Sequence, residues 1–151
     1  MAKINVGKGI KEYTKQLTQL YDISRTAIGQ TIYQGAAVVA AAMVSEIRGL
    51  PKDSCSPIEK ADLIDGFGIA RMQDKNGFYN VKLGFDGYNR IKTKKFPSGQ
   101  PNAMIARSIV SGTSFRQKND FVGRATRKSS SEAEEKMRAE FDKQLQALWP
   151  D

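Results

Sequence analysis

The residues that carry most enzyme chemistry are scarce in this chain of 151 residues. It has no histidine and a single cysteine, Cys55, so zinc bound by these ligands and Ser-His or Cys-His nucleophilic catalysis are excluded. One cysteine cannot close an internal disulfide, and an inert thiol is the simpler interpretation of Cys55. The cysteine content therefore fits a reducing cytoplasm.

Two carboxylates have a spacing that chemistry can use. Asp62 and Asp65 stand three residues apart on a predicted helix, where they could chelate a cation or act as an acid and base pair. Carboxylates on an exposed helix are far more often only solvated. No serine has a lysine three residues later, so that pattern of Ser-Lys chemistry is absent too. We therefore predict a protein that is not an enzyme and that needs no metal or cofactor.

Positive charge is concentrated in one segment. The net charge is +8, and residues 91–128 carry nine basic side chains against one acidic side chain. Such a block can contact phosphates, face an acidic protein partner, or form a solvated loop. The candidate contacts to DNA or a partner are Lys92, Lys94, Lys95, Arg107, Arg116 and Lys118.

The N-terminal third has the apolar spacing of helices. Ile10, Leu17 and Leu20 predict a short helix from Lys8 to Leu20, and residues 22–24 predict a break after it. A long helix to Gly49 should follow. Residues 35–44 are apolar on nearly every side, which predicts burial in the core or against a neighbouring subunit. The candidate subunit interface is Ala36, Val39, Ala40, Met43 and, from a later strand, Phe85.

In the middle of the chain the predicted structure changes from helix to β-hairpin. Residues 56–59 read as a capping box that starts a short helix, which Gly66 ends. Asn76-Gly77 predicts the turn of a β-hairpin with arms at 68–72 and 78–85. Residues 86–101 combine turn residues with lysines and predict a mobile basic loop.

The last third is expected to be helical again. A helix should start at Pro101-Asn102 and end at Gly112. Residues 121–126 read as a short apolar return, and Ser129 to Ser131 as the cap of an amphipathic C-terminal helix. The predicted class is α+β in a single domain over 1–151. A small antiparallel sheet built on the hairpin packs against the long N-terminal and the C-terminal helix.

Membrane and secretion signals are not expected. The longest apolar run, residues 35–44, is about half the length of a membrane span. The first six residues lack the apolar stretch and cleavage site of a secretion signal. We predict that the chain crosses no membrane.

Two segments resemble a known family. Residues 105–114 end in Ser111-Gly112-Thr113-Ser114, and residues 121–125 contain Phe121, Arg124 and Ala125 ahead of a charged amphipathic helix. Together with the order of the other elements, they resemble the tailed-phage tail-component family typified by the gene-ten protein of phage HK97. In that family a Pro-Phe-aliphatic-Arg-x-Ala segment opens the last helix. Here Asp120 stands in place of the proline.

The resemblance implies a structural protein of the virion. Family members are tail-completion or head-tail joining proteins, which form a ring, here expected to be hexameric, in the neck between head connector and tail. The implied partners are copies of the chain itself, a head-connector or head-closure protein, and a tail-terminator or tail-tube protein, with non-specific contact to packaged DNA. Assembly would take place in the host cytoplasm. From a different class, a small DNA- or RNA-binding protein acting through residues 91–128 remains the alternative.

Overall fold

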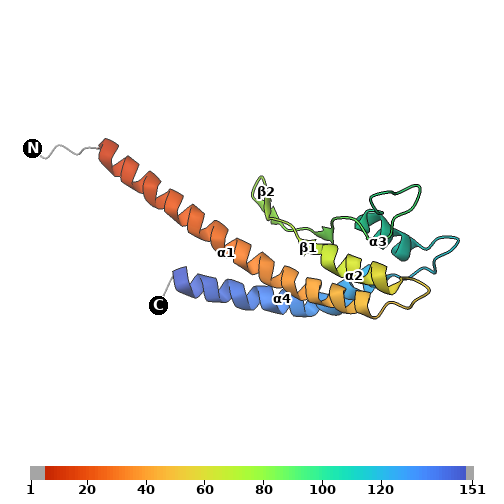
Figure 1. Ribbon diagram of the computed structural model, residues 1–151. Helices are drawn as coiled ribbons and strands as arrows, with labels where there is room; N and C mark the ends of the chain where they lie inside the picture. Colours follow the sequence, from red (N-terminus) through yellow and green to blue (C-terminus); the bar gives the residue numbers. More distant parts are fainter. Residues whose placement is uncertain (1–5, 149–151) are drawn as a thin grey trace, which may run out of the picture.

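The computed structural model describes residues 6–148 (Figure 1). Most of the residues on which the secretion prediction depends, residues 1–5, lie outside that range. The described chain forms four helices: α1 (Val6–Arg48), α2 (Pro57–Gly66), α3 (Asn102–Ser111) and α4 (Phe121–Leu148). Its four strands are β1 (Phe67–Ile69), β2 (Gln73–Lys75), β3 (Phe78–Asn80) and β4 (Leu83–Phe85). In Figure 1, α1 and α4 run side by side as a long arm, α2 and α3 lie at one end of it, and the β2 hairpin reaches back along α1.

The predicted α+β class is confirmed, with the sheet in two pieces. Strand β1 pairs antiparallel with β4, and β2 pairs antiparallel with β3. Both ladders belong to one long hairpin, and between them the Ala70 N–H still donates to the backbone oxygen of Lys82. The predicted turn is confirmed, because Asn76 and Gly77 have φ values of 55° and 83°, as a tight hairpin turn requires.

The prediction of two N-terminal helices is wrong, because α1 runs unbroken through residues 22–24. Asp22 accepts a hydrogen bond from the Thr26 hydroxyl at its backbone oxygen, which is an ordinary intrahelical contact. Aspartate and serine lower helix propensity by well under about 1 kcal/mol each. Without proline or glycine at this point, that penalty is too small to stop the helix.

The predicted start of the last helix is also wrong. Helix α4 begins at Phe121, so residues 121–126 are helical and Ser129 lies inside the helix. The cap is Asp120, whose carboxylate accepts a hydrogen bond from the backbone N–H of Gly123. Ser129 is buried and donates its hydroxyl proton to the backbone oxygen of Ala125. A serine can satisfy its hydroxyl in this way without ending a helix.

The two shorter helices are confirmed. Ser56 caps α2, with its side chain accepting from the N–H of Glu59 and the Glu59 carboxylate accepting from the N–H of Ser56. Helix α2 includes Gly66 as its last residue, and α3 ends at Ser111 before Gly112. Both helices therefore begin and end within a residue or so of the expected positions.

The core lies where the end of α1 meets the beginning of α4. Phe121, the first residue of α4, is fully buried, and its ring lies 6.2 Å from the ring of Phe85 in an edge arrangement. Phe85 also packs on Phe67 at 5.1 Å, which connects the β1–β4 ladder to the core. The buried cluster is completed by Met43, Ile47, Leu50, Cys55, Leu63, Ile105, Ala106, Ile109 and Ala125.

The apolar middle of α1 is buried only in part within the molecule. Gly35, Ala36 and Met43 are buried, whereas Ala37 and Ala41 are exposed. The sequence predicted burial of more than one face of this stretch. The structure buries one face of this stretch, and the burial of a second face stays a prediction.

One described helix has the length and composition of a membrane span. The segment Ile10–Arg48 of α1 meets that criterion, because the uninterrupted helix holds a longer apolar stretch than the ten residues considered in the sequence. The core helix of a soluble protein meets the same criterion. The expectation that the chain crosses no membrane stays a prediction.

Two phenylalanines provide a matched test of this core. Phe121→Ala should lower the free energy of unfolding by about 3–5 kcal/mol, because it empties a fully buried site. Phe115→Ala, at a side chain that is 82% exposed, should change it by less than about 0.5 kcal/mol. Urea unfolding followed by circular dichroism measures both. Equal effects would contradict a core centred on Phe121.

Candidate interaction surfaces

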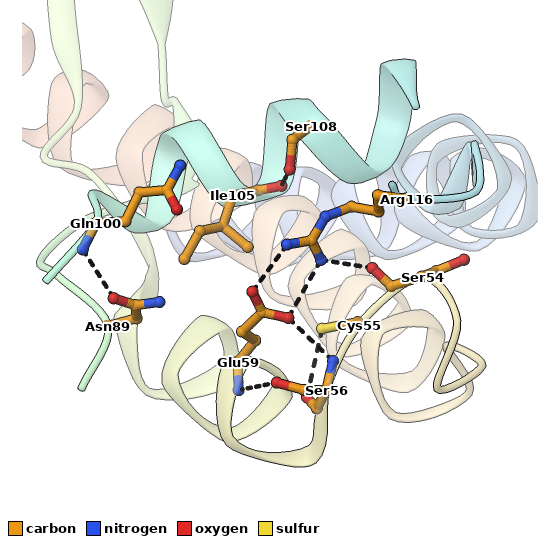
Figure 2. A network of polar contacts seen from close by, with 9 residues as sticks. All are labelled: Ser54, Cys55, Ser56, Glu59, Asn89, Gln100, Ile105, Ser108 and Arg116. Atoms are coloured by element: carbon orange, nitrogen blue, oxygen red, sulfur yellow. Dashed lines mark hydrogen bonds and ion pairs between the residues drawn. The ribbon is translucent and has the colours of Figure 1, made fainter. Parts of the chain in front are cut away.

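The base of the predicted mobile loop is held by hydrogen bonds. The Asp62 carboxylate accepts from the backbone N–H of Arg90 at 2.9 Å and from its Nε at 2.6 Å. Asn89 is buried and accepts at its side chain from the N–H of Gln100 (Figure 2). Asn102 is also buried and donates to the backbone oxygens of Asp62 and Asp86. Asp62 is thus a structural anchor, and Asp65, its predicted chelating partner, remains exposed.

Gly99 shows how tightly the loop closes. Its φ of 96° is a conformation that other residues rarely adopt, and a Cβ there would collide with the backbone oxygen of Asn89. The tip beyond this closure is exposed and carries Lys92, Lys94 and Lys95. Lys95 lies over the ring of Phe96, 5.7 Å from its centre. The loop has no regular secondary structure, as predicted, and its mobility stays a prediction.

Arg116 is engaged inside the molecule, which corrects its assignment as a partner contact. Figure 2 shows its guanidinium facing Glu59, with Nη2 donating to the carboxylate at 2.8 Å and Nη1 to the backbone oxygen of Ser54 at 2.6 Å. The two charged side chains are only 12% and 13% exposed. Arg116 therefore ties residues 112–120 to the start of α2, and it is not free to contact a phosphate.

Other basic side chains of the block also make ion pairs, at more exposed positions. Arg124 and Lys128 of α4 both contact the carboxylate of Glu46 on α1. Arg127 lies 3.7 Å from Asp120. The basic block therefore divides into an internally paired part and a free part. Within residues 6–148, the side chains of the block that make no ion pair are Lys92, Lys94, Lys95, Arg107 and Lys118.

Burial and neighbouring charges shift the pKa values of Glu59 and Cys55, which belong to this network. Burial by itself would raise the pKa of Glu59, but hydrogen bonds from Arg116 and Ser56 and the charge of Arg116 outweigh it and lower the pKa. Burial, followed by the charge of Glu59, raises the pKa of the Cys55 thiol to about 11. Cys55 is therefore a protonated, buried side chain, which agrees with the inert interpretation.

Open grooves lie on both sides of the exposed face of α1. The first, which we call the helix groove, lies between α1 and α4, has a volume of about 500 Å³, and includes Ala37, Ala41, Ser45 and Glu132. The second, the sheet groove, lies between α1 and β1 and has a volume of about 630 Å³. Ala40, Val44, Phe67 and Ile69 are among its lining residues. Ala41 and Ser45 line both, so the two grooves flank one ridge of small side chains.

The candidate interface residues fall in different places. Ala36 and Met43 are buried inside the molecule, at 6% and 5% exposure, so the contacts of this chain itself account for their burial. Val39 and Phe85 are half-buried, and Phe85 belongs to the aromatic contacts of the core. Ala40 lines the sheet groove. Of the five predicted positions, Phe85 also lines an open pocket, beside β1 and β4.

The residues of the family resemblance surround the beginning of α4. Ser111 ends α3, and Gly112 follows with a φ of 77°. Thr113 forms an isolated β-bridge with Arg116, and Ser114 is exposed beside it. In α4, Ala125 is fully buried beside Phe121, and Arg124 reaches Glu46. These positions join α3 to α4 and hold the start of α4 against α1.

Comparisons with protein-family models, with curated proteins and with solved structures gave no match to this chain.

Sequence reasoning missed two features of these surfaces. It did not find the helix groove, which needs the antiparallel placement of α1 and α4. It also did not pair Arg116 with Glu59, which stand 57 positions apart. A local signal existed for the start of α4, because Asp120 precedes an apolar pair and aspartate is a preferred N-cap.

The Glu59 ion pair makes the free energy of unfolding depend on pH in the acidic range. Since its folded pKa lies below the ordinary 4.5, ionised Glu59 stabilises the fold above about pH 4.5, and this contribution is lost as the pH falls through the lowered pKa. Glu59→Gln should therefore lose less stability than the wild type between about pH 5 and pH 3. Urea unfolding across that range measures the difference. Glu134→Gln, at an exposed position, should keep the wild-type slope, and equal slopes for all three proteins would contradict the prediction.

Proposed function

We propose that this chain is a non-enzymatic structural protein of a tailed-phage virion, which forms a ring in the neck between the head connector and the tail. The ring is expected to be hexameric. Its neighbours would be a head-connector or head-closure protein on one side and a tail-terminator or tail-tube protein on the other. It would be made and assembled in the host cytoplasm.

The observation that carries the proposal is the start of α4. Local patterns alone placed the last helix from Ser129, whereas the family resemblance implied that the segment containing Phe121, Arg124 and Ala125 opens it. Helix α4 begins at Phe121, which agrees with the family layout. The order that follows the first helix also supports it: a short helix, a hairpin, and a helix that ends next to Gly112-Thr113-Ser114. The family layout begins with a separate short helix before the long alanine-rich one, whereas here the two are one unbroken helix, α1.

The surface of the molecule supports assembly with protein neighbours. Two open grooves flank the exposed ridge at Ala41 and Ser45 of α1. Large apolar side chains are also exposed further along α1, among them Ile10 and Leu17. An isolated soluble chain rarely leaves so much apolar surface along one helix uncovered. A subunit of a ring completes this burial when it assembles.

A second candidate function uses the free part of the basic block. Lys92, Lys94 and Lys95 project from an exposed loop tip and make no ion pair with any residue of the described chain. Unpaired lysines of this kind can neutralise phosphates and release counterions. The chain would then be a small DNA- or RNA-binding protein. In a neck ring, the same lysines would face the DNA that passes through the channel.

Native mass spectrometry across a concentration series tests the ring. The expected result is a ring-sized oligomer, either of the chain alone or after addition of connector or tail protein. Ala40→Glu should reduce the oligomer, because it places a charge in the sheet groove. Ala103→Glu, at an exposed position of α3, is the control. A strict monomer that ignores both kinds of partner would contradict the proposal.

Filter binding of duplex DNA at two salt concentrations tests the second candidate. Changing Lys92, Lys94 and Lys95 together to glutamate should weaken binding at least about tenfold at low salt and flatten its salt dependence. The control changes Lys75, Lys136 and Lys143, also exposed lysines, so the net charge falls by the same amount. Equal losses in both triple variants would mean that the loop tip has no special role.

A further inference from the structure

We propose that two copies of this chain pair along the outer edge of β4, so that their β1–β4 ladders join into one four-stranded antiparallel sheet about a twofold axis. The partner is a second copy of the chain, and both copies use the same surface. The pairing goes beyond the proposed ring, because a ring repeats a head-to-tail contact between two different surfaces. It does not depend on the neck function.

Strand β4 has a strand neighbour on one side alone. Within residues 6–148 its sheet consists of β1 and β4. The sheet groove places β1 beside α1, so the outer edge of β4 lies on the side of the ladder away from that helix. Lys82, Gly84 and Asp86 are exposed and line an open pocket of about 430 Å³ beside the two strands. The edge is therefore open to a further strand.

The hydrogen bonds of the ladder show which backbone groups point out of this edge. The N–H of Asp86 donates to the backbone oxygen of Gly66. In an antiparallel ladder, hydrogen-bonded pairs alternate with pairs whose N–H and C=O groups point outward. Leu83 and Phe85 of β4 belong to outward pairs. Their N–H and C=O groups make no backbone hydrogen bond outside the ladder within the described chain, so they can bind a second strand.

One register of two β4 strands brings opposite charges together. When Gly84 of each copy lies at the twofold axis, Lys82 stands opposite the partner's Asp86, and this pair occurs twice. Neither side chain makes an ion pair within residues 6–148. In their own ladder they stand opposite Ala70 and Gly66, which carry no charge. The register therefore pairs two charges that have no partner on the strand beside them, which favours this arrangement.

Other registers lose this match. An axis at Lys82 or at Asp86 would place like charges opposite each other, which is destabilising. An axis at Leu83 or at Phe85 would place each charge opposite an uncharged residue. With the axis at Gly84, Leu83 stands opposite the partner's Phe85 on the other face of the sheet, so apolar side chains meet there as well. Both faces are thus matched in a single register.

A cysteine at the proposed axis tests the contact. Opposed residues of a non-hydrogen-bonded pair have Cα atoms about 4.5 Å apart, within the range of a disulfide. Gly84→Cys fits the backbone, because a Cβ there has no atom within 4 Å. Under mild oxidation of the full chain, this variant should give a covalent dimer. The native Cys55 can be kept, since it is buried.

Gly68→Cys is the matched control. Gly68 stands opposite Gly84 in the same ladder, is also exposed, and leaves equal room for a Cβ. In the joined sheet the two copies of Gly68 would be three strand spacings apart, or about 14 Å, which is too far for a disulfide. Gly84→Cys should therefore give at least about tenfold more dimer than Gly68→Cys.

Charge exchange tests the register. Lys82→Glu and Asp86→Lys, each added to Gly84→Cys, bring like charges together and should each lower the dimer yield at least about fivefold. An equal mixture of the two variants should restore the yield, because position 82 of each then faces an opposite charge at position 86 of the other. Lys75→Glu, at an exposed lysine of the other ladder, changes the net charge equally and should leave the yield unchanged.

Three results would overturn the proposal. Equal cross-linking of Gly84→Cys and Gly68→Cys would reject the edge contact, and a mixture that fails to restore the yield would reject the register. More dimer after Lys82→Glu would mean that this lysine guards the edge against pairing, as edge lysines can do.

Sedimentation without any added cysteine gives an independent test. Wild type should form a dimer that grows with concentration and is lost in Lys82→Glu, with the far-ultraviolet circular dichroism unchanged. A wild-type protein that forms no dimer at any concentration would overturn the pairing. Rings that form without the cross-link reject only the pairing, whereas cross-linked copies that bind neither connector nor tail protein reject only the neck function.

Discussion

The crossing of the two long helices at Phe121 is the constraint on which the rest of the structure depends. Phe121 opens α4 and is fully buried against the end of α1. The β1–β4 ladder joins this point through Phe67 and Phe85, and α2 and α3 add Leu63 and Ile105 to the same core. Because α1 ends and α4 starts here, the two helices leave the core side by side as one arm. Their unequal lengths then decide which part of α1 has a partner inside the molecule.

Ion pairs hold this crossing in register and engage part of the basic block inside the molecule. Glu46 of α1 binds Arg124 and Lys128 of α4, and Glu59 binds Arg116. The nearly buried pair of Glu59 and Arg116 should fix geometry more than it adds stability, since desolvation offsets much of the attraction. The number of basic residues in 91–128 is therefore larger than the number of unpaired basic side chains that a partner could contact. The basic side chains without an ion pair lie mainly at the loop tip. Hydrogen bonds made by Asp62 and Asn102 hold the base of this loop.

The sequence predicted most elements because local signals specified them. The capping box at Ser56 and the turn at Asn76-Gly77 need only neighbouring residues to form. The two wrong predictions, a helix break at residues 22–24 and a helix start at Ser129, both took polar residues as helix ends. At Asp22 the helix continues because the local preference against it is small, and at Ser129 packing of the buried face outweighs that preference. The grooves and the pairing of Arg116 depend on which helices lie side by side, and no local pattern carries that information.

The apolar composition of α1 would suit either a bilayer or a protein neighbour. The charged residues that α4 places beside α1 affect these two environments differently. The stretch between Arg25 and Glu46 contains no charged residue, and it is long enough to cross a bilayer. However, α4 lies alongside this stretch and brings Lys128, Glu132 and Lys136 to the edge of the helix groove. A bilayer around the folded arm would have to desolvate these charges, at about 2–4 kcal/mol each near its centre. A protein helix placed in the groove would cover the small side chains and leave these charges at a solvated rim.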